Sequence, residues 1–243
     1  VEVGSEQQYL DFGIKEVSKL SGEDVKRNLL DAGLFGYINQ LPYAVSTNPE
    51  VQPEAIFVSA LRDMPLASDF EVELAGNEDA FQVGLSALNK IAKVHLGIGP
   101  KQVNSTLTKV ADVEITIYDG PCPAGNVGVQ INNTRPITKG EVIWIVDPAT
   151  VIFIGRLFLT GKVDLRKVVA VAGSEVKKPC YIDTIVGAPF SSLLKGQIDN
   201  AAHIRIINGN PLVGNKSCMT DYVGGHTSEV TVIPEGDNIN EML

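Results

Sequence analysis

Few side chains in this sequence are of the types that carry out catalysis or hold metals. The three histidines and three cysteines lie far apart, at His95, His203, His226, Cys122, Cys180 and Cys218. None has a second histidine or cysteine at the spacing of a metal site. We therefore expect no metal, no iron–sulfur cluster and no disulfide framework, and we predict no catalytic residue. Scattered cysteines in odd number suit a reducing compartment.

The segment from Asp119 to Gly128 is the best candidate for a ligand contact. It reads Asp-Gly-Pro-Cys-Pro-Ala-Gly-Asn-Val-Gly, with three glycines and two prolines in ten residues. Glycines leave backbone N–H groups uncovered for a ligand carbonyl, and prolines offer apolar surface. The candidate contact residues are Gly120, Pro121, Pro123, Gly125 and Gly128. A second interpretation is that the loop is a rigid connection between layers, since Asp119 is its only acid or base.

A phosphate-binding loop is missing where a nucleotide fold would need it. Between Gly36 and Gly76 the chain has no glycine, and it contains neither GxGxxG nor GxxxxGK[ST]. The first buried strand expected, at 55–61, is followed by Arg62-Asp-Met-Pro-Leu66, whose side chains and proline crowd the position of a pyrophosphate. We therefore expect the chain to bind neither FMN nor NADH.

Charge and hydropathy exclude two classes of partner. The net charge of −9 argues against nucleic acid and against bare anionic lipid. The longest apolar run, Val168–Ala172, equalled by Val142–Val146, has five residues, whereas a membrane span needs about 20. We expect no span. With 44% apolar residues, the chain can bury a core.

Alternating elements must position these residues in the first two thirds of the chain. Ser21 and Asp24 form a capping-box pattern that starts a helix. The periodicity predicts helices at 22–32, 78–92 and 102–110 and strands at 55–61, 71–74, 93–98 and 113–118. Strands separated by helices are typical of a parallel sheet with crossover helices. The fold class is therefore α/β, with ligands expected at the carboxyl ends of the strands.

From residue 168 the pattern changes to short strands. They are expected at 168–173, 180–186 and 204–207, with a short helix at 189–194. One helix on a small sheet indicates a β-grasp module. We predict domains at 1–167 and 168–217, and a C-terminal segment, 218–243, leading to a missing domain. Residue 1 is Val, and Asn238–Leu243 carries no closing cap, so we expect a middle fragment of a longer protein.

Several segments in one order give the chain a family resemblance. They are Ala55-Ile-Phe-Val-Ser, Met64-Pro-Leu-Ala, the Asp119–Gly128 loop, Ile154-Gly-Arg-Leu-Phe-Leu-Thr-Gly161, Val168-Val-Ala-Val-Ala-Gly173 and Lys178-Pro179. Together they resemble the NqrA family, whose members are subunits of the bacterial sodium-translocating NADH:quinone oxidoreductase, from about Ser21 to Pro234. The resemblance implies a Rossmann-like domain, related to the flavin-bearing subunit of complex I but without cofactor motifs, followed by a soluble-ligand-binding β-grasp (SLBB) domain.

The resemblance also implies a role for the whole complex. The chain would be a peripheral, cofactor-free subunit on the cytoplasmic face of the inner membrane, docked on the membrane subunits of the pump, especially NqrB. FMN, riboflavin, FAD and the iron–sulfur centre would belong to other subunits, and quinone would contact this chain, if at all, at the Asp119–Gly128 loop. The alternatives are a free-standing flavin- or NADH-binding oxidoreductase module and a purely structural adaptor.

Overall fold

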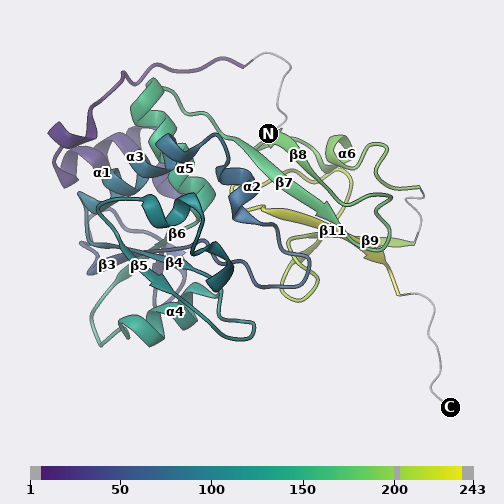
Figure 1. Ribbon diagram of the computed structural model, residues 1–243. Helices are drawn as coiled ribbons and strands as arrows, with labels where there is room; N and C mark the ends of the chain where they lie inside the picture. The colour runs from purple at the N-terminus through teal and green to yellow at the C-terminus, as the bar shows by residue number, and fades with distance from the viewer. Residues whose placement is uncertain (1–6, 200–202, 237–243) are drawn as a thin grey trace. The chain divides into compact units, whose positions relative to one another are not determined.

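The computed structural model describes residues 7–199 and 203–236 and divides into two compact units (Figure 1). The α/β unit comprises Gln7–Asp63 and Asp69–Asp164. The β unit comprises the described residues from Leu165 onward together with Met64–Ser68. The C-terminal residues Asn238–Leu243, which the sequence shows without a closing cap, lie outside the described residues.

The α/β unit is built on a mixed sheet with a parallel centre. Within the described residues its strand order is β2-β1-β6-β3-β4-β5. β3, β4, β5 and β6 run parallel, and β1 pairs antiparallel with both β6 and β2. The strands are β1 Ile38–Leu41, β2 Val45–Ser46, β3 Ala55–Ser59, β4 Val94–Ile98, β5 Glu114–Ile117 and β6 Ile143–Val146. The predicted fold class is confirmed.

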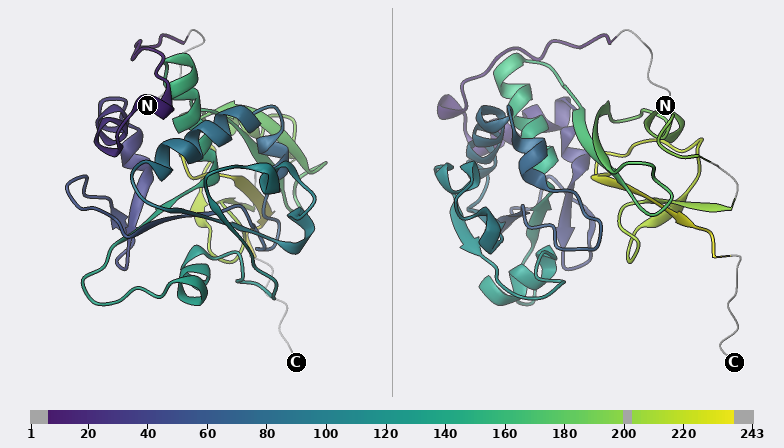
Figure 2. Two further views of the ribbon diagram at one scale, coloured as in Figure 1. Left: turned by 60° about the vertical axis from the view of Figure 1, so that its left-hand side comes forward. Right: turned by 45° about the vertical axis from the view of Figure 1, so that its right-hand side comes forward.

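Helices cover both faces of this sheet (Figures 1 and 2). One face carries α1, α3 and α5, and the other carries α4. The helices are α1 Gly22–Asp31, α2 Phe70–Leu74, α3 Glu78–Asn89, α4 Val127–Thr134 and α5 Pro148–Thr160, with short 3-10 turns at Val17–Lys19, Leu34–Tyr37, Pro100–Gln102 and Thr106–Lys109. Below the sheet, Ile131 of α4 packs against Ala55, Phe57 and Ile143, which holds α4 to the central strands.

Three predicted elements differ from the structure. The alternating residues Glu71–Leu74 form the helix α2 rather than a strand, because Asp69 accepts the Glu71 N–H at 3.0 Å and caps it. The helix predicted at 102–110 is two 3-10 turns. The end of the glycine-rich loop belongs to α4, whose start is capped by Asn126. The capping box of Ser21 and Asp24 is confirmed.

Helices α3 and α5 touch through glycines. A Cβ added to Gly155 would lie 1.7 Å from the carbonyl oxygen of Ala80, and one on Gly84 would lie 2.1 Å from the oxygen of Val151. Both neighbours are backbone atoms that cannot rotate away. The two helices therefore approach each other backbone to backbone, a contact that only glycine permits.

Arg156 and Gly161, in the same segment as Gly155, also stabilise the α/β unit. The Arg156 Nη2 atom donates to Asn77 Oδ1 at 2.6 Å, just before α3, and its Nη1 lies 3.9 Å from Asp164 Oδ1. Gly161 ends α5 with a positive φ of 72°, a left-handed conformation that suits glycine. This segment of the sequence resemblance is thus explained by helix packing and capping.

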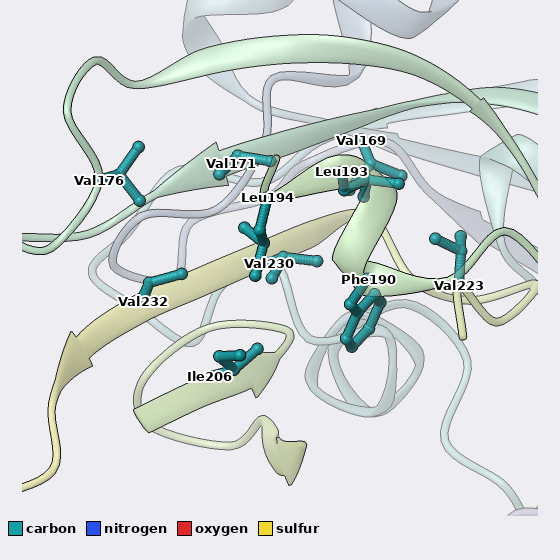
Figure 3. Packing of buried hydrophobic residues seen from close by; sticks show 10 residues of the cluster. All are labelled: Val169, Val171, Val176, Phe190, Leu193, Leu194, Ile206, Val223, Val230 and Val232. Atoms are coloured by element: carbon teal, nitrogen blue, oxygen red, sulfur yellow. The ribbon is translucent and has the colours of Figure 1, made fainter. Parts of the chain in front are cut away.

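The β unit is a mixed sheet that has a hydrophobic core of its own. Within the described residues its order is β10-β9-β11-β7-β8, with β11 parallel to β7 and antiparallel to β9. Its elements are β7 Arg166–Ala172, β8 Cys180–Ile185, α6 Phe190–Leu193, β9 Ile204–Asn208, β10 Asn215–Ser217 and β11 Glu229–Pro234. Phe190 and Leu193 of α6 pack on Val169, Val230 and Val232 (Figure 3).

The sheet of the β unit extends beyond the domain boundary predicted at residue 217. β11 lies in its middle, with Val230 and Thr231 completely buried. Glu229 begins this strand and Glu235 follows it, and these charges obscure the strand pattern of Val230-Thr-Val232 in the sequence. Residues 229–234 therefore belong to the small sheet rather than to a segment leading away from it.

Candidate functional site

The Asp119–Gly128 loop lies at the carboxyl end of β5 and leads into α4. Its residues from Asp119 to Pro123 are exposed. Two tight turns shape it, because the Ala124 N–H donates to the Pro121 oxygen at 3.1 Å and the Asn126 N–H to the Pro123 oxygen at 2.9 Å. The loop therefore presents its prolines outward while its second half turns back onto the sheet.

Gly125 anchors the loop to the end of β3. Its N–H donates to Asp63 Oδ2 at 3.0 Å, and its carbonyl oxygen accepts from Ser59 Oγ at 3.0 Å. A Cβ here would lie 2.6 Å from the backbone oxygen of Leu61 and 2.5 Å from Asp63 Oδ1. The loop is therefore fastened by a glycine whose missing side chain allows the close approach.

Gln130 is a second anchor that the sequence interpretation missed. This fully buried α4 side chain donates from Nε2 to Ser59 Oγ at 2.9 Å and to the Ala124 oxygen at 3.1 Å. Its Oε1 sits against Gly97 of β4, where a Cβ would come within 2.3 Å. The signal in the sequence is weak: a glycine inside a buried strand, and a glutamine two residues after the loop.

These contacts correct one part of the sequence prediction. The amides of Gly125 and Gly128 are not uncovered, because Asp63 accepts the first and Asn126 Oδ1 accepts the second at 2.8 Å. Gly120, Pro121 and Pro123 are exposed as expected. As a ligand contact, the predicted set thus divides into an outer rim of three residues and an inner pair that fixes the loop. Whether either part meets a ligand stays a prediction.

The strand order also reveals a second strand-end position, between β3 and β6. The chain reverses its direction of strand addition there, which is where open α/β sheets bind ligands. Arg62 fills this position: its Nη2 lies 3.5 Å from Glu73 Oε2 and 3.9 Å from Asp147 Oδ1, and its guanidinium lies 5.4 Å from the centre of the Phe70 ring. Protein side chains therefore occupy both strand ends.

His95 is a buried core residue rather than a ligand. Its ring stacks on Phe57 with centroids 4.6 Å apart, and its Nδ1 lies 3.7 Å from Glu114 Oε2. Burial lowers the pKa of His95, and this outweighs the attraction of Glu114; Lys93 and Arg135 lower the pKa further. Glu114 itself pairs with Lys93, which lowers the pKa of the carboxyl.

This environment predicts a pH dependence of stability. The unfolded chain takes up a proton at His95 near pH 6.5, whereas the folded chain does so only at lower pH. The stability contributed by neutral His95 is therefore complete above pH 6.5 and declines as the pH falls below it. We expect the urea midpoint of His95→Gln to fall less between pH 7.5 and pH 5 than that of the wild type. Equal declines in both proteins would contradict this account.

The three cysteines lie in different segments: Cys122 in the Asp119–Gly128 loop, Cys180 in β8 and Cys218 after β10. None of the three forms a disulfide bond. Within residues 7–199 and 203–236, no group of three or more His, Cys, Asp or Glu side chains is arranged to hold a metal ion. None of the helices in these residues has the length and apolar character needed to span a bilayer.

Solved structures share this fold at low sequence identity. The crystal structures of an NAD+-reducing [NiFe]-hydrogenase, air-oxidised and H2-reduced, match with TM-scores of 0.59 and 0.58 at 12% and 13% identity. Each covers 87% of this chain, which in turn covers 46% and 47% of those chains. The likeness shows the fold class alone, an α/β unit followed by a small sheet.

Family models and curated relatives show the family. Residues 20–163 match the model of the NqrA second alpha/beta domain, and residues 168–219 match the NQRA C-terminal domain. The NqrA subunit of the Na(+)-translocating NADH-quinone reductase of Photorhabdus laumondii is 35% identical over 241 residues, and that of Glaesserella parasuis 34% over 239. Each match covers 96% of this chain. The chain spans about half the length of these relatives, 53%. It belongs to the NqrA family.

Proposed function

We propose that this chain is the central part of the NqrA subunit of a sodium-translocating NADH–quinone reductase, in which it serves as a peripheral docking subunit. The observation that carries the proposal is the match of two NqrA domain models in order along the chain, at 20–163 and 168–219. The relatives are named as subunits of this reductase. Electron transfer from NADH to quinone and sodium export would then be activities of the assembled complex.

Within that complex, we place the β unit against another subunit, with the membrane subunit NqrB as the expected neighbour on the cytoplasmic face. The support is an ordered turn between β9 and β10 that displays apolar side chains. Asn210 Oδ1 accepts the N–H groups of Leu212 and Val213, each at 3.0 Å, and both side chains are 66% exposed. Rigid, exposed apolar groups are typical of protein contacts.

The chain itself is proposed to work without a redox cofactor. In the α/β unit, the ends of β3 and β6 are taken up by the Arg62 cluster, and Asp63 and Gln130 hold the loop beside them. A free-standing flavin or NADH enzyme would need this space. The redox groups would thus lie in other subunits, and any quinone contact would be a binding contact at Gly120, Pro121 and Pro123.

Three measurements test these proposals. We expect the full-length NqrA protein to co-purify with the other subunits from membranes, and an azido-quinone to label the peptide that contains residues 119–128. Labelling confined to other subunits would leave this chain as an adaptor without quinone contact.

Micromolar binding of FMN or NADH to the isolated full-length protein, with a free energy of about −8 kcal/mol, would favour the free-standing oxidoreductase instead.

A further inference from the structure

A cavity of about 550 Å³ lies on the α/β unit beside the residues that lead into β4 and β5, whereas the Asp119–Gly128 loop follows β5. Its walls come from α3, from residues 15–18, from the end of α5 and from the loop before β5. Small-molecule sites typically have volumes of about 300–1,000 Å³. The size of this cavity therefore suits a small ligand, and the proposed function makes no use of it.

Hydrogen-bond donors line one end of the cavity, where α3 ends. The Lys90 ammonium donates to the Ser18 oxygen at 3.4 Å, and it has no carboxylate partner among the described residues. Asn89 Oδ1 accepts the Val94 N–H at 3.2 Å, so the Nδ2 group of Asn89 keeps its donors for another molecule. Hydrogen bonds from a cation to a carboxylate are among the strong ones in proteins. This end of the cavity therefore suits a carboxylate.

Asp112 supplies a carboxylate to the cavity, and the loop that carries it is fixed to α3. The Ala111 N–H donates to Gln82 Oε1 at 2.8 Å, and Gln82 Nε2 donates to the Ala111 oxygen at 3.2 Å. Asp112 itself has a φ of 64°, a left-handed conformation that aspartate tolerates better than most residues. Within the part of the chain that the structure describes, its carboxylate accepts no hydrogen bond and forms no ion pair. It is therefore available to an ammonium group.

The remaining charged side chains of the cavity are held by the chain itself. Glu16 accepts from Ser18 Oγ at 2.6 Å and pairs with Lys19 at 2.5 Å, so its charge is neutralised. The Lys15 ammonium donates to Asn28 Oδ1, a neutral partner, and keeps its positive charge. Among the described residues that line the cavity, two cations and one anion therefore lack a partner of opposite charge.

The spacing of these groups sets the length of the ligand. Gln82, which holds the loop before β5, and Asn89 lie about two helical turns apart on α3, which is about 10 Å. An extended peptide advances about 3.3–3.6 Å per residue, so about three residues span that distance. Val17, Val83 and Leu159 also line the cavity and provide apolar surface for aliphatic side chains.

We propose that this cavity binds a short aliphatic peptide with free ends, of about three residues, whose carboxylate meets Lys90 and Asn89 and whose ammonium meets Asp112. Its side chains pack on the apolar part of the wall. A fatty acid would instead place an uncharged chain against the Asp112 carboxylate, and a diamine would place a cation at Lys90. The proposal does not depend on the assignment to the reductase, because it uses only groups of the α/β unit.

Calorimetric titration of the full-length protein with trialanine tests this site. We expect saturable binding with a dissociation constant on the order of 0.1 mM, since two charged ends and an apolar body contribute together. N-acetylation and C-amidation of the peptide should each weaken binding about tenfold, because each removes one charged contact. The absence of saturable binding, equal binding of the doubly blocked peptide, or tighter binding of octanoate would overturn the proposal.

Variants at the two ends of the cavity test which group meets which end of the peptide. Asp112→Asn should bind N-acetylated and free trialanine equally, and Lys90→Gln should lose most of the difference between the amidated and the free peptide. Both residues are exposed, and asparagine tolerates a left-handed backbone as aspartate does, so the melting temperatures should equal that of the wild type. Asp31→Asn and Lys101→Gln change exposed residues elsewhere on the same unit and should keep both differences. If the cavity variants kept them too, the assignment would be wrong.

Discussion

Replacing Gly155 by alanine is expected to lower the free energy of unfolding by about 3 kcal/mol or more. The new methyl group would lie 1.7 Å from the Ala80 oxygen, far inside contact distance, and the obstacle is backbone. Helices α3 and α5 would have to separate, and buried side chains on both, such as Phe81 and Phe158, would lose packing. Urea denaturation followed by circular dichroism measures the change.

Two further glycine variants test the cause of this effect. Gly84→Ala meets the Val151 oxygen at 2.1 Å on the same helix contact and should cost a similar amount. Gly36→Ala is the matched control, because its Cβ would have no heavy atom within 4 Å. That change should leave stability unaltered or raise it by about 0.5–1 kcal/mol. Equal midpoints for Gly155→Ala and Gly36→Ala would refute the close helix contact.

Most of the α/β unit could be predicted from the sequence because its signals are local. The capping box predicts the helix at Gly22–Asp31, and a continuous apolar run predicts β3. Glu71–Leu74 was predicted wrongly because so short a segment does not separate alternation from a helical turn. A cap supplied by Asp69 decided between the two.

The candidate site was harder to predict because its contacts join distant segments. Asp63 and Gly125 meet only because β3 and β5 end at the same edge of the sheet, and Ser59 and Gln130 meet for the same reason. The glycines of the loop predict backbone N–H groups that are open to a hydrogen-bond acceptor. They do not reveal that the acceptors are the chain's own Asp63 and Asn126 side chains.

Likewise, no sequence signal placed β6 beside β3. The position of the Arg62 cluster therefore could not be read from the order of the elements. Arg62 and Asp147 lie far apart along the chain and meet only where strand addition reverses direction. The sequence places Arg62 after the first buried strand, but the pairing of β3 with β6 had to be known before Asp147 could be placed beside it.

The second large effect is expected at the anchor of the loop. Gly125→Ala should destabilise the α/β unit by about 1–3 kcal/mol. The added Cβ would lie 2.6 Å from the Leu61 oxygen, which is backbone, and 2.5 Å from Asp63 Oδ1. Asp63 can rotate away, but it would then give up its hydrogen bond with the Gly125 N–H. The Leu61 oxygen cannot move without disturbing the end of β3.

Gly120→Ala is the matched control within the same loop, since its Cβ would make only an ordinary contact, 3.8 Å from the Ala124 Cβ. We expect it to keep wild-type stability and wild-type amide protection. In Gly125→Ala, hydrogen exchange should speed up across residues 124–130, because Ser59, Asp63 and Gln130 hold these residues through bonds that converge on the anchor. If exchange in Gly125→Ala matched that of Gly120→Ala, the loop would be held by its prolines and turns instead. The rim formed by Gly120, Pro121 and Pro123 would then owe nothing to the strand ends, and its proposed quinone contact would lose its structural support.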